Sequence, residues 1–447
     1  MPNRVRFDQH LPSIHDSQFL LERAEGLIPA QTQTLAKGPS QYSRGVCPVY
    51  AVRGKGSHVW DVDGNEFIDY SMGVGPVSLG YCYPKVDEAI KRQLEQGITF
   101  SLMHPLEVEV AELIRHVVPH TECVRFSKTG ADVTSAAIRL ARAHTGKNKV
   151  LCCGYHGWHD WYIGVTSRNA GIPPTVMEYT NTFAYNDIVS VESAIDDDTA
   201  CVILEPMVFE EPRNNFLHDL RTLCSDRGVV LIFDEMWTGF RLALGGAQEH
   251  FGVRADLCTF SKAIANGMPL AVLTGREEIM QLCEKDVFFF TTFGGETLSL
   301  AAARATIEEM AVRRVPEHLQ AKGRWLQSNL NTIFELRDMT FLKCVGAPCR
   351  TMLSIGSTPI GNPLEIKTFF QQEFLRHGIL WSGFHTMSYS HTEEDIDFTV
   401  RAYGEILTKL LSILRNGESV RDHLLGETLE PVFRRTGNFH IKPKVRS

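Results

Sequence analysis

The feature that most constrains the fold of this chain is a regular alternation of helix-like and strand-like segments, which begins near residue 84. Apolar residues recur with helical spacing in some segments and form short continuous runs in the segments between them. The helical pattern covers 85–96, 105–117, 131–145, 213–227 and 297–313, and the strand-length runs cover 149–153, 200–204, 229–233, 257–260 and 270–273. Such alternation is typical of an α/β fold, in which helices cover both faces of a mostly parallel sheet.

The pattern changes after about residue 315, where a long helix is followed by short strands near 351–355 and 378–381 and by a helix at 393–415. A chain of 447 residues is also longer than one simple core usually accommodates. We therefore expect a second, smaller α+β domain in this part of the chain.

The N-terminal part carries two weaker signals. Residues 1 to about 45 are polar and weakly patterned, which predicts an arm or a short helix. The stretch HVWDVDGNEFIDYS then alternates apolar and polar residues around Asp63-Gly64, a strong signal for a β-hairpin. Its acidic residues do not have the spacing of a calcium-binding loop.

Charge and cysteine content narrow the possible functions. The net charge of −8 argues against a nucleic-acid-binding surface. The one basic cluster lies in the last fifteen residues, where a solvated tail is expected: Arg434, Arg435, Lys442, Lys444 and Arg446. The chain shows no signal-peptide pattern and no apolar stretch near the ~18 residues of a membrane span. Several of its eleven cysteines lie in apolar patterns, so we expect a reduced, cytoplasmic protein.

Two of the predicted buried strands lead into charged residues. Asp234 closes the run VVLIFD, and Lys262 follows the run at 257–260. Ligands of open parallel sheets bind at the carboxyl ends of the strands, where both residues stand. A buried carboxylate is costly unless it meets a cation, whereas a buried lysine loses its proton readily and can form a Schiff base with an aldehyde. The structural alternative is a buried Asp–Lys ion pair without a chemical role.

A turn that opens a helix supplies a third feature. Thr129-Gly130 precedes the helical pattern at 131–145, and free N–H groups at the positive end of a helix bind anions. Pyridoxal phosphate (PLP) would use all three features, because it has a phosphate, an aldehyde for Lys262 and a ring nitrogen that Asp234 can keep protonated. Neither a G-x-G-x-x-G nor a GK[ST] loop is present, which argues against dinucleotide and P-loop sites.

The stretch CCGYHGWHD, which follows the run at 149–153, admits a metal-site interpretation. However, adjacent cysteines and one H-x-x-H pair do not have the usual zinc spacing. We therefore expect no metal site, and we favour a role for Tyr155, which can stack on a flat heterocycle at a strand end.

Seven motifs occur in the order found in class III aminotransferases, and the chain resembles that family over about residues 44–415. They are TGADVTSAAIRLARAHTG, YHGWHD, LEP, FDEMWTGFR, FSKAIANGMP, TTFGG and HTEEDID. The likeness is greatest to the glutamate-1-semialdehyde 2,1-aminomutase-like branch. The resemblance implies the α/β fold type I of PLP-dependent transferases, with a large domain around a mixed, mainly parallel seven-stranded sheet and a smaller α+β domain.

The same resemblance implies a domain order and an assembly. An N-terminal segment at 1–75 would join the small domain, the large PLP-binding domain would span 76–314, and the C-terminal small domain with its tail would span 315–447. It also implies a homodimer with active sites at the interface.

Roles of single residues are implied as well. Lys262 resembles the Schiff-base lysine and Asp234 the partner of the pyridine nitrogen, and these are the two expected catalytic residues. The further implied cofactor contacts are Thr129, Gly130 and Ala131 at the phosphate, Tyr155 and Met236 on the two ring faces, and Thr292 reaching the phosphate from the partner subunit. Glu205 of the LEP motif is implied to lie near the cofactor.

The expected activity is that of a PLP-dependent aminotransferase, which moves an amino group between an amine or amino-acid donor and a carbonyl acceptor through Lys262. The alternative is a glutamate-1-semialdehyde-type aminomutase or a racemase on the same fold, although Val74 stands where the aminomutase has tryptophan. A non-catalytic scaffold would be expected to lack Lys262 or Asp234, and both are present. Arg44 and Arg241 are candidates for binding a substrate carboxylate, with a structural salt bridge as the alternative for each.

Overall fold

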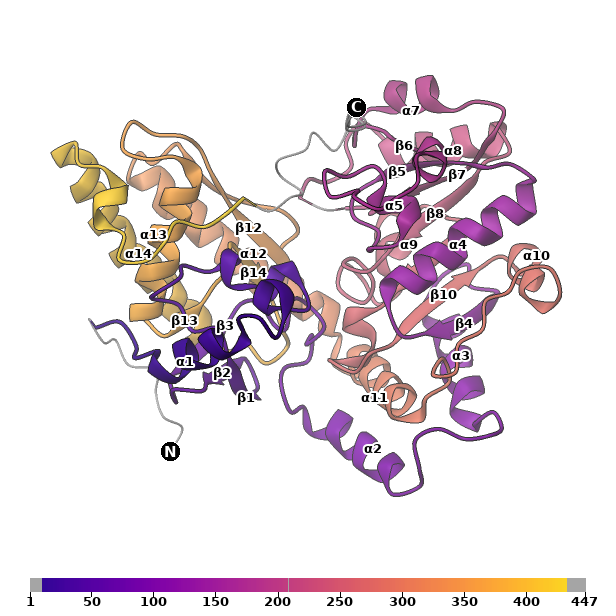
Figure 1. Cartoon of the computed structure of the whole chain (residues 1–447), viewed down its shortest axis with the longest axis horizontal. Helices are drawn as coiled ribbons and strands as arrows, with labels where there is room; N and C mark the ends of the chain where they lie inside the picture. The colour runs from indigo at the N-terminus through magenta and orange to yellow at the C-terminus, as the bar shows by residue number, and fades with distance from the viewer. Residues whose placement is uncertain (1–9, 208, 432–447) are drawn as a thin grey trace. The chain divides into compact units, whose positions relative to one another are not determined.

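The computed structural model describes residues 10–207 and 209–431, which form two compact units (Figure 1). One unit comprises residues 10–83 and 318–431, and the other comprises residues 84–317. The basic residues of the expected C-terminal tail lie outside the described residues.

The unit formed by residues 84–317 is built on a seven-stranded sheet. In spatial order its strands are β4 (Cys123–Ser127), β10 (Ala271–Gly275), β9 (Leu257–Phe260), β8 (Val230–Asp234), β7 (Thr199–Leu204), β5 (Lys149–Cys153) and β6 (Thr180–Thr182). β10 is antiparallel to both of its neighbours, and the other pairings are parallel. The mixed, mainly parallel α/β sheet predicted above is therefore confirmed.

Helices pack around this sheet and connect its strands. The longer ones are α2 (Pro84–Leu94), α3 (Pro105–Val117), α4 (Gly130–Thr145), α8 (Phe216–Asp226) and α11 (Thr297–Arg313). The short ones are α5 (Asp160–Ile163), α6 (Pro174–Glu178), α7 (Ile188–Ala194), α9 (Gly246–Phe251) and α10 (Glu277–Met280). All five predicted helices form, with small shifts at their ends. Of the strands, β4 and β6 were not predicted, because β4 is half-exposed over most of its length and β6 has three residues.

The core lies between α4 and the middle strands. α4 runs across the strands in Figure 1 and packs on β7, β8, β9 and β10. β7 and β8 are buried along their whole length, which is why they appear in the sequence as continuous apolar runs. On the helix, Val133, Ala137 and Leu140 share the face that packs against this core. Because β7 and β8 are packed on both faces, the residues at their carboxyl ends are held in place.

The unit formed by residues 10–83 and 318–431 contains two smaller sheets. The first has the order β1 (Ala51–Lys55), β2 (His58–Asp61), β3 (Glu66–Asp69) and β13 (Ile379–Leu380), and the second has the order β11 (Leu342–Val345), β12 (Arg350–Ile355) and β14 (Phe384–Thr386). Its main helices are α1 (His15–Ala24), α12 (Val315–Leu336), α13 (Pro363–Arg376) and α14 (Glu393–Asn416). The hairpin predicted around Asp63-Gly64 is confirmed as the antiparallel pair β2–β3.

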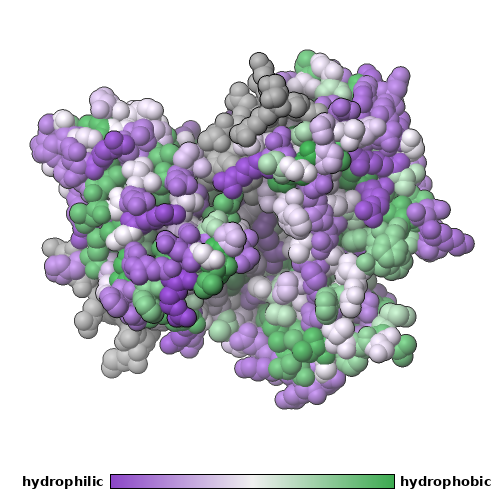
Figure 2. All heavy atoms as spheres, viewed as in Figure 1, coloured by the Kyte–Doolittle hydropathy of each residue, from purple (hydrophilic) through white to green (hydrophobic). Residues whose placement is uncertain are grey.

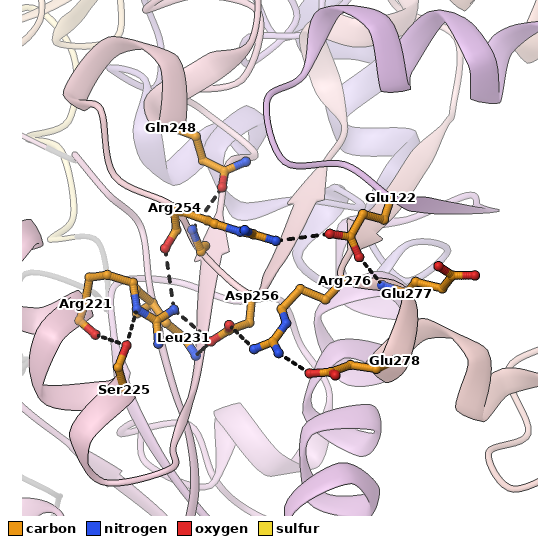
Figure 3. Close-up of polar contacts among 11 residues, drawn as sticks. Glu122, Arg221, Ser225, Leu231, Gln248, Arg254, Asp256, Arg276, Glu277 and Glu278 are labelled. Atoms are coloured by element: carbon orange, nitrogen blue, oxygen red, sulfur yellow. Dashed lines mark hydrogen bonds and ion pairs between the residues drawn. The ribbon is translucent and has the colours of Figure 1, made fainter.

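The amino ends of β8 and β9 are joined by a polar network (Figure 3). Asp256 accepts the backbone N–H of Leu231 and forms ion pairs with Arg221 at 2.8 Å and Arg276 at 2.9 Å. Burial would raise the pKa of Asp256, but the Arg221 guanidinium, the Leu231 amide and Arg276 together lower it. The carboxylate therefore remains charged. It holds together the amino ends of β8 and β9, which lie opposite to the carboxyl ends that carry the predicted site.

Candidate active site

The predicted site residues come from the carboxyl ends of the strands in residues 84–317. Asp234 is the last residue of β8 and pairs in register with Thr259 of β9. Lys262 follows β9 after one intervening residue, so Asp234 and Lys262 stand at the ends of neighbouring strands. Thr129 follows β4, and Tyr155 follows β5. This edge is where an open parallel sheet binds ligands.

Asp234 forms a buried pair with His156. The Oδ2 atom of Asp234 lies 2.8 Å from Nδ1 of His156, and neither side chain is exposed to solvent. The other oxygen, Oδ1, accepts the backbone N–H of Met236 at 3.1 Å. The carboxylate is therefore held at both oxygens, which fixes its direction at the strand end.

The second ring nitrogen of His156 limits how protons are distributed in this pair. Nε2 lies 3.2 Å from the carbonyl oxygen of Cys153, which can only accept a hydrogen bond. Nε2 must therefore carry a proton. Nδ1 then either donates to an ionised Asp234, which makes the ring cationic, or accepts a proton from a neutral Asp234. In both states one proton is shared between the two side chains.

Lys262 lies in an unusual backbone conformation. Its φ angle is 51°, in the left-handed region, and it begins the short 3-10 helix η4 (Lys262–Ala265). A non-glycine residue in this region is strained, and strain of this kind concentrates at functional sites. The Nζ atom lies 4.5 Å from the centroid of the Trp237 ring. The side chain is half-buried.

The turn before α4 is held by a reciprocal cap. The Thr129 hydroxyl oxygen accepts the backbone N–H of Asp132 at 3.3 Å, and the Asp132 carboxylate accepts the backbone N–H of Thr129 at 2.9 Å. Asp132 also accepts the Ser127 hydroxyl at 2.8 Å. The first amides of a helix have no partner within the helix, so the N–H groups of Gly130 and Ala131 are available to an anion.

Met236 lies against this turn. A Cβ atom added at Gly130 would stand 2.9 Å from Sδ of Met236, which is closer than such atoms approach in proteins. Gly130 therefore lets Met236 lie against the turn without a shift of its side chain. The structure thus brings Gly130 together with Met236 and Asp234, which come from a separate part of the sequence.

Tyr155 is positioned by Glu205, which follows β7. The Glu205 carboxylate accepts the backbone N–H of Tyr155 at 2.8 Å. A Cβ atom at Gly154 would come within 2.7 Å of the same carboxylate, and Gly154 has a φ of 111°. The Tyr155 ring meets the Tyr162 ring edge-on, with 5.5 Å between centroids. Glu205 therefore shapes the backbone of the loop that presents Tyr155.

Thr292 is exposed, and within the described ranges no hydrogen bond joins it to the other predicted residues. Its loop is nevertheless tied to the turn before α4, because Glu296 pairs with Lys128 at 2.9 Å. Burial would raise the pKa of Glu296, but the Lys128 ammonium and other donors lower it. The structure therefore links the two segments without bringing Thr292 itself to the other residues.

The two arginine candidates differ. Arg241 is fully buried and donates to the backbone carbonyl of Trp237 at 3.0 Å, a contact within its own turn. Arg44 is exposed and belongs to the other compact unit.

Two residues of this site were not predicted from the sequence. His156 was considered only as a metal ligand, and Trp237 was given no role. The sequence feature that could have indicated His156 as a site residue is its position directly after Tyr155, near the end of a strand. No group of three or more metal-ligand side chains occurs in the part of the chain that the structure describes. Within the same ranges, no helix is both long and apolar enough to cross a membrane.

A sequence profile described as "Aminotransferase class-III" matches residues 41–392 of this chain. The chain belongs to the class III aminotransferase family. It is 35% identical over 410 residues to the 3-aminobutyryl-CoA aminotransferase of Cloacimonas acidaminovorans, covering 89% of this chain and 98% of that protein. It is 34% identical over 426 residues to the glutamate-1-semialdehyde 2,1-aminomutase of Methanosarcina acetivorans, covering 88% and 99%.

Solved structures agree with this assignment. The FumI protein of Sphingopyxis sp. MTA144, in its PLP internal aldimine form, superimposes with a TM-score of 0.82 at 28% identity, over 89% of this chain and 97% of that one. A transaminase with PLP bound gives a TM-score of 0.83 at 26% identity, over 90% and 99%. The fold is therefore fold type I, and this class III enzyme is a PLP-dependent aminotransferase.

The residues present fit this cofactor. The turn at Thr129 offers free amides to a phosphate, Lys262 offers an amine to an aldehyde, and Asp234 offers a fixed carboxylate to a ring nitrogen. The three groups come from elements that share one edge of one sheet, so a single flat cofactor can use them together.

Proposed function

We propose that Lys262 binds the cofactor aldehyde covalently, and that its amine later moves the proton on the substrate carbon as general base and acid. When bound, PLP supplies the aldehyde and an electron-withdrawing ring that makes this proton removable. The observation that carries the proposal is the placement of Lys262 and the Asp234–His156 pair at the ends of neighbouring strands.

Asp234 would face the ring nitrogen and keep it protonated. His156 supports this role because it holds Oδ2 of Asp234 at 2.8 Å while the Met236 amide holds Oδ1. A carboxylate fixed in this way needs little reorganisation when charge develops on the ring.

The remaining predicted residues would bind and orient the cofactor. Thr129, Gly130 and Ala131 would hold the phosphate at the start of α4, where the helix dipole favours an anion. Tyr155 and Met236 would lie on the two faces of the ring. Met236 is supported by its contact with the turn, and Tyr155 by the Glu205 hydrogen bond that fixes its loop.

A half-reaction tests the transferase activity. The PLP-loaded enzyme is mixed with an amino donor and no acceptor, and the carbonyl product is counted. Transfer predicts about one product molecule per protomer and no further turnover until an acceptor is added. Continuous turnover with a single compound would contradict it.

The second candidate is an aminomutase that returns the amino group to the same molecule. It is favoured by relatives named glutamate-1-semialdehyde 2,1-aminomutase at 32% to 36% identity. The same experiment separates the two candidates, because a mutase converts its substrate to an isomer without releasing a carbonyl compound.

We also propose a homodimer formed through an apolar surface of residues 84–317. We call it the 98–108/288–293 surface, and it comprises the exposed residues Ile98, Phe100, Leu102, Met103, Val108, Phe288, Phe290 and Phe293. Thr297, four residues after Phe293, donates its backbone N–H to the Ile98 carbonyl at 3.1 Å, which ties the start of α11 to the 98–108 segment. Figure 2 shows apolar atoms gathered around the α2 region of this unit. Exposed apolar patches of this kind mark interaction sites.

This surface includes Phe293, the neighbour of Thr292. A second copy seated on it would therefore meet the loop that carries Thr292, which supports the proposal that Thr292 reaches the partner's phosphate. We further propose a cytoplasmic location. All eleven cysteines are described, and each is a free thiol. That state is typical of reducing compartments.

A further inference from the structure

Trp237 lies against the amine of Lys262. The Nζ atom is 4.5 Å from the ring centroid, well within the ~6 Å range of a cation–π contact. Trp237 belongs to the turn after β8, and Lys262 begins η4 after β9. The contact therefore joins the carboxyl ends of the two strands that carry the proposed catalytic residues.

The position of the Trp237 ring is fixed from its other neighbours. Arg241 donates Nη1 to the Trp237 carbonyl at 3.0 Å, and its guanidinium lies 5.1 Å from the ring centroid. Arg241 is fully buried, so this cation has little freedom to move. Phe240, which precedes Arg241, packs its ring on that of Phe260 in β9, with 5.7 Å between the ring centroids. The turn that carries the indole, and the ring itself, are thus held by contacts in addition to the one with Lys262.

We propose that Trp237 is a positioning residue for Lys262, whose ring holds the protonated amine at the ends of β8 and β9 while that amine is not bound to the cofactor. The inference rests on the proposed function, in which Lys262 is released and then acts on the substrate. A released lysine has four rotatable side-chain bonds and a left-handed backbone, and a fixed aromatic face restricts where its amine can go.

A Trp237 substitution leaves every charged residue of the chain in place, and Arg241 keeps its hydrogen bond to the backbone carbonyl of residue 237 while losing its contact with the ring. The charged residues at the end of β8 and in the turn after it are Asp234, Glu235 and Arg241. The helix α11 also packs on η4, but its residues Arg304 and Glu309 pair with α3 and α2 through Glu109 and Lys85. A change in the titration of Lys262 after a Trp237 substitution therefore reports the loss of the ring.

The experiment measures this titration in enzyme freed of cofactor. The protein is labelled briefly with acetic anhydride across a range of pH, and labelling of Lys262 is quantified by peptide mass spectrometry. Trp237→Leu is expected to lower the pH of half-maximal labelling by about 0.4 to 1.5 units, which corresponds to a two- to thirtyfold loss of preference for the charged amine. Trp237→Phe, which keeps a smaller ring, is expected to give a smaller decrease.

Trp325→Leu is the matched control, because this exposed tryptophan lies in α12 of the other unit. Its midpoint should equal that of the unmodified enzyme. Easier access of the reagent raises the labelling rate at every pH, and better hydration of the amine would raise the midpoint, so a purely structural role of Trp237 would not lower it. If Trp237→Leu does not fold, Trp237→Met replaces it with the same expectation.

Midpoints that agree within error for the wild type and Trp237→Leu, or Trp237→Met in its place, would overturn the inference. Its failure is distinct from failure of the proposed function, which is judged separately by the donor half-reaction of the wild-type enzyme. A normal half-reaction with an unchanged midpoint removes the role of Trp237 alone. An absent half-reaction removes the proposed function on which that role rests.

Discussion

The His156 ring is expected to matter for the cofactor because it orients Asp234. In His156→Ala, a buried carboxylate loses the partner of its Oδ2 atom, which costs about 1–3 kcal/mol of stability. Affinity for PLP should fall about tenfold, since Asp234 no longer has a fixed direction. Thermal unfolding and a PLP titration by absorbance measure the two effects.

His159→Ala is the control for this variant. His159 lies in the same loop, but its Nδ1 atom contacts Ser135 at 2.6 Å instead of Asp234. Its PLP affinity should remain close to that of the wild type. Equal losses in both variants would mean that the loop as a whole, and not the pair with Asp234, supports the cofactor.

Glu235, the neighbour of Asp234, makes stability depend on pH. Burial raises its pKa to about 7, although the amides of Ala247 and Gln248 and the Thr238 hydroxyl oppose this shift. The folded state thus binds the proton more tightly than the unfolded state. The stabilisation from this group is complete below about pH 4.5 and decreases as the pH rises through about 7, by roughly 3 kcal/mol in total.

Glu235→Gln cannot ionise and should lack this dependence. Its temperature of unfolding, measured relative to the wild type, should therefore increase steadily between pH 5 and pH 8. A difference that stays constant over this range would show that Glu235 does not titrate there.

Among the helices, α4 is the one whose first turn is expected to bind the phosphate. Asp132→Ala removes the acceptor for the Thr129 amide and the Ser127 hydroxyl, at a cost of about 1 kcal/mol. Affinity for PLP should fall severalfold, whereas affinity for pyridoxal, which has no phosphate, should not change. Both affinities are measured by absorbance titration.

Asp187→Ala is the matched variant, because Asp187 caps α7 through the Ser190 amide at 3.1 Å. It should lose comparable stability and keep both affinities. If Asp132→Ala weakened pyridoxal and PLP equally, the turn would not be the phosphate site.

The elements that carry this site could be predicted because their patterns are local. β8 is continuously apolar because both faces of the strand are buried, and α4 has a cap at Thr129 and a left-handed glycine at Gly146. β4 could not be predicted, since its half-exposed residues give no continuous run. Resemblance to the family supplied roles that patterns alone do not assign.

The contact between His156 and Asp234 could not be predicted from local patterns either. The two residues are 78 positions apart, and β7 lies between the strands that present them. The pair therefore depends on the order of strands in the sheet, which periodicity does not reveal. The same holds for Trp237, whose contact with Lys262 requires β8 and β9 to be neighbours.

The assembled protein is expected to be a dimer whose sites depend on both subunits. Leu102→Asp combined with Met103→Asp places charges on the 98–108/288–293 surface, where the two side chains are 81% and 82% exposed. Desolvating unpaired carboxylates in an interface should weaken association at least about 100-fold, as measured by analytical ultracentrifugation. Leu336→Asp, at an equally exposed site in α12, should remain dimeric. An unchanged dimer in the double variant would exclude this surface.

The central claim is that one amine, Lys262, holds the cofactor. The direct test is to reduce the PLP-loaded enzyme with borohydride, digest it and locate the modified lysine by mass spectrometry. We predict that the reduced cofactor is found on the peptide containing Lys262, and that Lys262→Ala retains no covalently attached cofactor. Attachment to another lysine, or full labelling of the Lys262→Ala variant, would contradict the account.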